Sequence, residues 1–195
     1  MLLHKPSDAE VRNFLAEQSK LSISYPEVGA TRSSRLPAGY PINHYRGKLG
    51  AGGEMFERAV ASMRAWEMYS LDWTKLCWPD TPVREGEVVG VLAHHLGLWS
   101  LNACRIIYTL EEERGDSRRT GFAFGTLPGH VEEGEERFTV ELKGESGEVS
   151  YELFAFARPK PLVAKIAYPI VRALQRRFAQ DSCAAMRRAV NRRGE

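Results

Sequence analysis

Five segments between residues 87 and 157 alternate apolar and polar side chains, and this pattern limits most strongly what the chain can fold into. They are Glu87–His95, Leu98–Leu110, Arg118–Leu127, Glu135–Lys143 and Gly147–Ala157. Glycine, proline or clustered charges separate them at short spacing. A period of two with short connections is typical of neighbouring antiparallel strands. The clearest case is Glu135–Lys143, where Phe138, Val140 and Leu142 share one face. Glu136, at the start of that face, is its one polar member.

The segment 160–190 has a different period and predicts one long helix. Large apolar side chains recur there every four residues, at Leu162, Ile166, Ile170, Leu174 and Phe178. Arginines occupy the opposite face, as expected for a helix with one side on a core. Pro169 lacks a backbone donor, so we expect a kink near the first third of this helix.

The first part of the chain predicts fewer regular elements. Ser7 with Glu10 three residues later is a capping box, so a helix is expected over 7–20. Residues 21–41 are rich in proline and glycine and predict loops. Ile42–Leu49 reads as a strand, followed by a helix inserted at 54–70.

These elements predict a single α+β domain over 1–195, with the sheet spanning 42–158. A curved antiparallel sheet of about six strands is expected to wrap around the long C-terminal helix, which is a helix-grip arrangement. A chain of 195 residues can bury a substantial core without disulfides. If core side chains do not fill the space between sheet and helix, a cavity remains there.

The composition argues against several classes of protein. The three cysteines are widely spaced and form no C-x-x-C pair, which argues against a disulfide framework and a zinc ribbon. The N-terminus does not read as a signal peptide, and no apolar run reaches the length of a membrane span. The expected location is the cytoplasm.

Charge is distributed unevenly along the chain. Residues 84–157 carry 14 acidic and 7 basic side chains, whereas residues 158–195 carry 2 acidic and 10 basic ones. The simplest interpretation is a basic helix docked on an acidic sheet. The alternative is a helix that contacts an acidic partner, a membrane surface or nucleic acid, and nucleic acid is the less expected partner.

Several motifs resemble one family. They are Tyr25–Thr31, Gly50–Trp66, Cys104-Arg105, the stretch Gly121–His130 containing Gly-Thr-Leu-Pro-Gly-His, and Gly134–Phe138. Together they are similar to the domain-of-unknown-function family numbered nineteen-ninety, found in bacteria and plants, from Tyr25 to about Ala185. That family resembles the START and Bet v 1-like superfamily. The resemblance implies a helix-grip fold with an internal apolar cavity, and it implies no reaction. Where the family has proline after the motif histidine, this chain has Val131.

Two polar residues are the main candidates for ligand contact. His130 lies in a loop with four glutamates and could orient a ligand or, with a glutamate, act as an acid–base pair. Arg105 interrupts an apolar strand, so it either pairs with a carboxylate or reaches into the cavity, where it could hold an acidic group. The aromatic residues expected to line a cavity are Trp99, Tyr108, Phe122, Phe124, Phe138 and Tyr151. The first role expected of these aromatic residues is packing in the core.

Other sites find no support in the sequence. The glycines at 50–53 do not match a phosphate-binding motif, and Glu54 would repel a phosphate. The spacing around His130 matches no closed metal site. No metal and no cofactor are therefore expected.

Three functions stay open from the sequence. The first is binding of a small hydrophobic ligand between sheet and helix. The second is an enzyme of cyclase, isomerase or hydrolase type that uses a His/Glu pair in the same cavity. The third is an interaction module that uses the basic C-terminal helix. The oligomeric state is not predicted.

Overall fold

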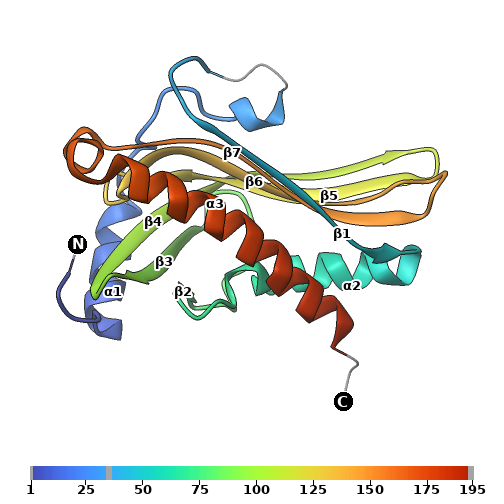
Figure 1. The fold of residues 1–195 in the computed structure, drawn as a ribbon, viewed down its shortest axis with the longest axis horizontal. Coiled ribbons are helices and arrows are strands. Elements are labelled where there is room, and N and C mark those ends of the chain that lie inside the picture. Colours follow the sequence, from blue (N-terminus) through green and yellow to red (C-terminus); the bar gives the residue numbers. More distant parts are fainter. Residues whose placement is uncertain (1, 34–36, 193–195) are drawn as a thin grey trace.

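The computed structural model describes residues 2–33 and 37–192, except the side chains of 161–167. A strongly curved antiparallel sheet forms the body of the molecule, and a long helix crosses its concave side (Figure 1). The sheet has seven strands in the order β1-β7-β6-β5-β4-β3-β2. This confirms the helix-grip fold, although the predicted count of about six strands is one too low.

The strands are bounded as follows: β1 Ile42–Ala51, β2 Thr74–Cys77, β3 Val88–His95, β4 Leu98–Arg114, β5 Ser117–Thr126, β6 Glu132–Leu142 and β7 Glu148–Pro159. The helices are α1 Asp8–Gln18, α2 Gly53–Arg64 and α3 Pro161–Asn191, with short 3₁₀ turns η1 Ala30–Arg32 and η2 Glu67–Tyr69. The unpredicted strand is β2. It is four residues long, too short to show an alternating pattern.

The inserted helix ends earlier than its pattern predicts. Helix α2 stops at Arg64, and Trp66 adopts a left-handed backbone with φ of 59°. A residue in the left-handed region cannot continue a right-handed helix, so α2 ends before Trp66. Bulky residues rarely take that conformation. The chain then folds back through η2, which places Trp66, Met68 and Tyr69 in the core.

The C-terminal half of α3 packs tightly against β1. Cys183 is buried, and a Cβ added to Gly47 would lie 2.2 Å from its Sγ. Tyr151 on β7 bonds through its hydroxyl to Ser182 Oγ at 2.7 Å. This half of the helix is therefore fixed to the sheet.

The N-terminal half of α3 is held less closely. Figure 1 shows its first turns nearly end-on and the rest lengthwise, in line with the predicted kink at Pro169. Ile170 was predicted to face the sheet, but it is 47% exposed. The kink is the physical reason, because it breaks the four-residue spacing that aligned Ile170 with Leu174 and Phe178. The side chains of Leu162 and Ile166 lie outside the described part of the chain.

Changing Gly47 to Ala tests the close approach of α3 to β1. We expect G47A to lower the free energy of unfolding by about 1–3 kcal/mol, because the added methyl group overlaps Cys183. The double variant G47A/C183A should recover most of that loss, measured by urea unfolding. If G47A is as stable as the wild type, the helix does not lie this close to the strand.

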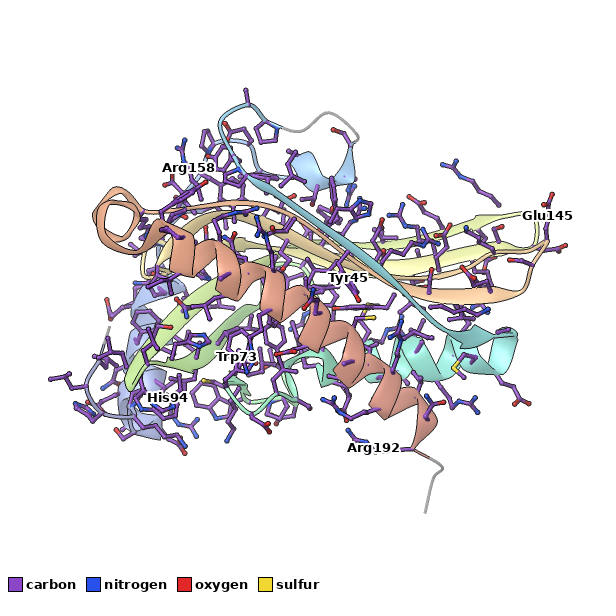
Figure 2. All side chains as sticks on the ribbon, viewed as in Figure 1. Tyr45, Trp73, His94, Glu145, Arg158 and Arg192 are labelled. Carbon is purple, nitrogen blue, oxygen red and sulfur yellow. The ribbon has the colours of Figure 1, made fainter. Side chains whose placement is uncertain are left out.

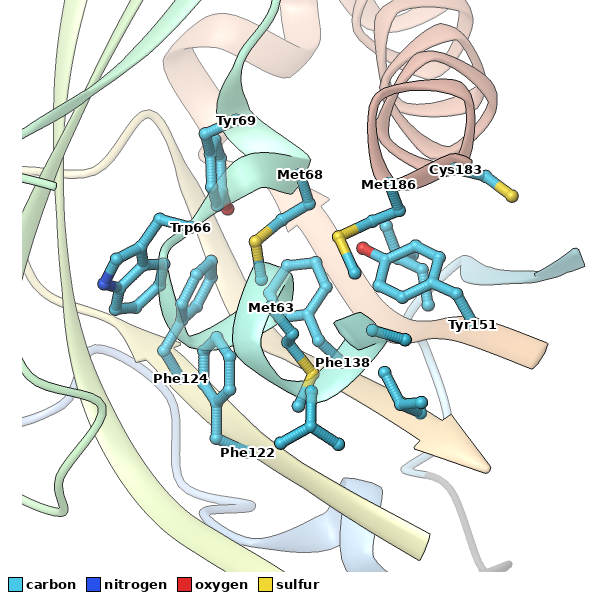
Figure 3. Close-up of a cluster of buried hydrophobic side chains, with 14 of the residues drawn as sticks. Met63, Trp66, Met68, Tyr69, Phe122, Phe124, Phe138, Tyr151, Cys183 and Met186 are labelled. Carbon is cyan, nitrogen blue, oxygen red and sulfur yellow. The ribbon is translucent and has the colours of Figure 1, made fainter. Parts of the chain in front are cut away.

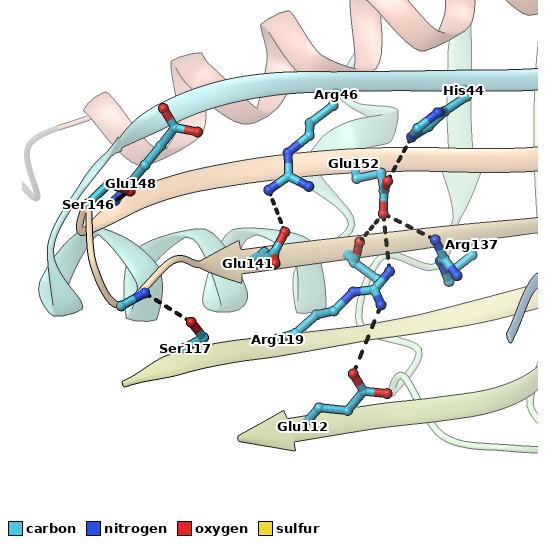
Figure 4. Close-up of polar contacts among 12 residues, drawn as sticks. His44, Arg46, Glu112, Ser117, Arg119, Arg137, Glu141, Ser146, Glu148 and Glu152 are labelled. Atoms are coloured by element: carbon cyan, nitrogen blue, oxygen red, sulfur yellow. Dashed lines mark hydrogen bonds and ion pairs between the residues drawn. The ribbon is translucent and has the colours of Figure 1, made fainter. Parts of the chain in front are cut away.

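The convex face of the sheet carries an ionic network centred on Glu152 (Figure 4). Its Oε2 accepts hydrogen bonds from Arg119 at 3.2 Å, Arg137 at 3.1 Å and Thr139 at 3.1 Å. Its Oε1 lies 2.7 Å from His44 Nε2. These partners come from β1, β5 and β6, so with Glu152 on β7 the network ties four strands together across the sheet.

The loop residues 21–33 cover another part of the convex face and are held by one buried carboxylate. Glu135 of β6 is 1% exposed. It accepts hydrogen bonds from Tyr25 Oη at 2.7 Å, Gly29 N at 2.6 Å and Thr31 N at 2.9 Å, and another from the Thr31 hydroxyl. Arg137 Nη1 donates to the Thr31 carbonyl beside it. A family-like motif in the sequence, residues 25–31, thus folds around a single side chain.

Candidate functional site

The predicted site residues fall on both faces of the sheet. Phe122, Phe124, Phe138 and Tyr151 point to the concave side and belong to the main core. Trp99, Arg105 and Tyr108 point to the convex side, so they do not line the space beneath α3 as predicted. His130 lies in the loop between β5 and β6.

Each of the three convex residues has a structural partner. Trp99 stacks on His94 with ring centroids 4.4 Å apart. Arg105 donates from Nη2 to the Ser19 carbonyl at the end of α1, at 2.7 Å. Tyr108 follows a bulge at Ile106/Tyr108 and bonds to Thr31 at 2.7 Å. The sheet has two covered faces here, because α1 and the loop residues 21–33 pack on the convex one. Strand parity alone cannot tell which face is which.

The aromatic residues on the concave side form a solid core over much of the sheet (Figure 3). Phe122, Phe138 and Tyr151 are fully buried. Side chains from α2, η2 and α3 fill the space in front of them, namely Met63, Trp66, Met68, Tyr69 and Met186. An apolar cavity over this part of the sheet is therefore ruled out by packing.

Beneath the N-terminal half of α3 the concave face is polar. Glu132 and Glu136 of β6 both point there, on the same face as Phe138. Glu132 Oε1 accepts a hydrogen bond from Gln175 Nε2 of α3 at 2.6 Å, and Arg172 donates to Gln175 Oε1 at 2.5 Å. Glu136 lies opposite Phe124 on β5 and Ala155 on β7.

Glu136 is unusual because its carboxyl has no partner. Among the residues that the structure describes, no group donates a hydrogen bond to it. Burial raises its pKa to about 8, with a further contribution from the charge of Glu132. Its side chain is nevertheless only half-buried. A side chain that is largely surrounded by protein but keeps some accessible surface is expected to face an internal space.

The ionisable groups near Glu136 also have raised pKa values. Burial raises the pKa of Glu132 to about 7, while the hydrogen bond from Gln175 opposes that rise. Burial also raises the pKa of the Cys104 thiol and of the Tyr69 hydroxyl, both within reach of the field of Glu136. The two carboxyls thus lie in a region where an ionised acid is costly.

His130 is oriented by the backbone rather than by a carboxylate side chain. Its Nδ1 accepts a hydrogen bond from the Glu132 N–H at 2.9 Å, which leaves the proton on Nε2. Burial lowers the pKa of the imidazole to about 3, and Lys160 nearby adds to that shift. His130 is therefore neutral, and among the described residues it forms no His/Glu side-chain pair of the kind predicted.

A separate pocket of about 500 Å³ opens beside the edge strand β2. Trp66, Tyr69 and Trp73 lie in its wall, together with His94 and Trp99. Its charged side chains, Lys5, Asp72 and Lys75, are exposed to solvent. Tyr69 and Trp73 also contact Phe178 of α3. Figure 2 labels Trp73 and His94 of this pocket.

Metal binding and membrane insertion find no support in the described part of the chain. No group of three or more His, Cys, Asp or Glu side chains is placed there to hold a metal ion. Over the same residues, no helix has both the length and the apolar character that a membrane span requires.

The model of one protein family, "Domain of unknown function (DUF1990)", matches residues 24–185. The chain belongs to this family. Relatives in it include a "UPF0548 protein" of Dictyostelium discoideum, 32% identical over 95% of this chain and 94% of the relative. A "UPF0548 protein" of Deinococcus radiodurans is 34% identical, over 96% of this chain and 98% of the relative.

Solved structures agree with the fold. TTHA0849 from Thermus thermophilus matches with a TM-score of 0.52 at 16% identity, over 77% of this chain and 97% of that one. Ara h 8.0201 and human STARD10 match with TM-scores of 0.45 and 0.46. Because those scores are lower, the helix-grip assignment of this family member depends on its own sheet and helix.

The sequence patterns indicate His130 and the aromatic residues as site residues, but not Glu132 and Glu136. One signal was available, because Glu136 is the polar member of an otherwise apolar strand face. Its position at the start of the predicted strand made it look like an end residue. In the structure β6 begins earlier, at Glu132, so Glu136 lies inside the sheet.

Proposed function

We propose that this protein binds a small, largely apolar molecule between the concave face of the sheet and the N-terminal half of α3. The observation that carries the proposal is Glu136, a desolvated carboxyl with no hydrogen-bond donor among the described residues. A ligand that donates a hydrogen bond to this carboxyl would give it the partner that the described residues do not provide.

The walls of the proposed site are mainly apolar. Phe124 lies on the sheet side, and Leu174 and Phe178 are half-buried on α3. Gln175 and Phe178 contact groups beneath the helix, and Leu174 lies on the same helical stripe. Burying roughly 300 Å² of ligand surface at about 25 cal/mol/Å² supplies on the order of 7 kcal/mol before the cost of association. This supports affinities in the micromolar range.

A bulky substitution on the helix tests the site. We expect the wild type to bind an uncharged fluorescent probe such as N-phenyl-1-naphthylamine, and L174W to weaken binding at least tenfold by filling the space. The matched control is A173W, on the exposed side of the same turn, which should bind as the wild type does. Absence of probe binding by the wild type, or equal binding by L174W, would contradict the proposal.

A second candidate is an enzyme that uses a glutamate as general acid. The specific observation is that Glu136 holds its proton near neutral pH, since burial raises its pKa to about 8. A general acid works best with a pKa near the operating pH. The two candidates differ in one measurable respect. For a general acid, E136Q should keep ligand binding and abolish turnover.

A further inference from the structure

We propose that the ligand carries a protonated amine and that the carboxylate of Glu136 receives it. This inference rests on the proposed function and adds the chemical class of the ligand. It follows from which groups surround Glu136 and from the sign of the charge that is missing there.

Aromatic side chains lie next to Glu136 on the same side of the sheet. Phe124 lies directly opposite it on β5, and Phe138 lies two residues further along the same face. The rings of Phe124 and Phe138 are 5.4 Å apart, and that of Tyr69 is 6.5 Å from Phe124 and 6.1 Å from Phe138. Ring faces attract a cation and repel an anion. Of these rings, Phe124 lies directly opposite Glu136, so a cation bound to the carboxylate would lie beside it.

The balance of charge points the same way. Glu132 adds a second carboxyl on the same face. Arg172 is the described basic side chain in the hydrogen-bond network of these carboxyls. It donates to Gln175, which in turn donates to Glu132. No described Lys, Arg or His forms an ion pair with Glu136. An acidic ligand would add a negative group beside two carboxyls, whereas an ammonium group would pair with Glu136 once that carboxyl loses its proton.

Binding of an ammonium group is expected to depend on pH. The titratable groups around Glu136 are Glu132 on its own strand, Cys104 on β4, Tyr69 on η2 and Tyr151 on β7. Burial raises all of their pKa values, so only the two glutamates titrate between pH 6 and 8. Glu136 must lose its proton to pair with the amine. Amine affinity should therefore rise at least tenfold between pH 6 and pH 8, and alcohol affinity should not.

The experiment compares three ligands with one apolar body: 1-naphthylmethylamine, 1-naphthylmethanol and 1-naphthylacetate. Binding is measured at pH 8 by titration calorimetry on the wild type, E136Q and E133Q. We expect the wild type to bind the amine at least tenfold more tightly than the alcohol, and the acid most weakly. E136Q should bind amine and alcohol alike. Glu133, the control, pairs with Arg158, and E133Q should keep the wild-type preference.

The outcomes separate the two proposals. Equal binding of amine and alcohol by the wild type overturns the ammonium proposal and leaves ligand binding intact. No binding of any of the three ligands counts against the proposed function itself. An amine preference that survives in E136Q overturns the assignment to Glu136. If E136Q does not fold, the wild-type affinities at pH 6 and pH 8 decide, because a flat amine profile also overturns the proposal.

Discussion

E135A is expected to lower the free energy of unfolding by about 4 kcal/mol, the size of effect seen when a buried charged network loses one member. The carboxylate of Glu135 accepts from two backbone N–H groups and two hydroxyls of residues 25–31. Without it those donors are buried and unpaired, and Arg137 loses a neighbouring negative charge. Urea unfolding followed by tryptophan fluorescence measures the loss.

Two further variants show whether the carboxylate itself is responsible. E135Q keeps one acceptor oxygen but turns an N–H₂ group toward other donors, so we expect a loss of about 2 kcal/mol. Y25F removes a single donor and should cost about 1 kcal/mol. If E135A unfolds at the same urea concentration as the wild type, the loop is held by something other than this side chain.

The second large effect concerns pH. Between pH 6.5 and pH 9 we expect the free energy of unfolding to fall by about 3 kcal/mol, since one pKa unit corresponds to 1.36 kcal/mol. The pKa of Glu136 is raised to about 8 and that of Glu132 to about 7 by burial. The folded state therefore binds more protons than the unfolded state above pH 4.5, and stability is lost as pH rises through these two values. His130, whose pKa is lowered to about 3, acts in the opposite direction below pH 6.5.

The matched variant is E136Q, which cannot ionise. Its unfolding free energy should fall by only about 1 kcal/mol from pH 6.5 to pH 9, because Glu132 still titrates there, and should exceed that of the wild type at pH 9. E133Q should follow the wild type. A wild-type profile that stays flat over this range would show that Glu136 is solvated or paired in the folded protein.

These two effects concern neighbouring residues of one strand. Glu135 points to the convex face and Glu136 to the concave face, because successive side chains alternate. Glu135 is bound to loop residues on one side, so the strand cannot slip by one residue without burying the wrong glutamate on each side. The well-paired carboxylate therefore holds the unpaired one in the interior. Stability on one face maintains a costly group on the other.

Much of the architecture could be predicted from local patterns. The six longer strands, the capping box of α1 and the long C-terminal helix all follow from short-range periodicity and turn residues. Residues close in the chain decide these features, so the sequence contains them directly. The strand β2 and the early end of α2 could not be predicted. They depend on a four-residue segment and on a left-handed Trp66, which only tertiary contacts stabilise.

The candidate site was predicted only in part. The sequence by itself determined which residues alternate along each strand, and hence that Phe124, Glu136 and Phe138 point toward defined faces. Only the tertiary structure decided which face lies under α3, that α2 and η2 fill most of the concave side, and that Arg105 and Tyr108 turn away from it. The physical reason is that alternation is a property of one strand. Which side becomes enclosed, and how completely, depends on the volumes of side chains brought together from distant parts of the chain.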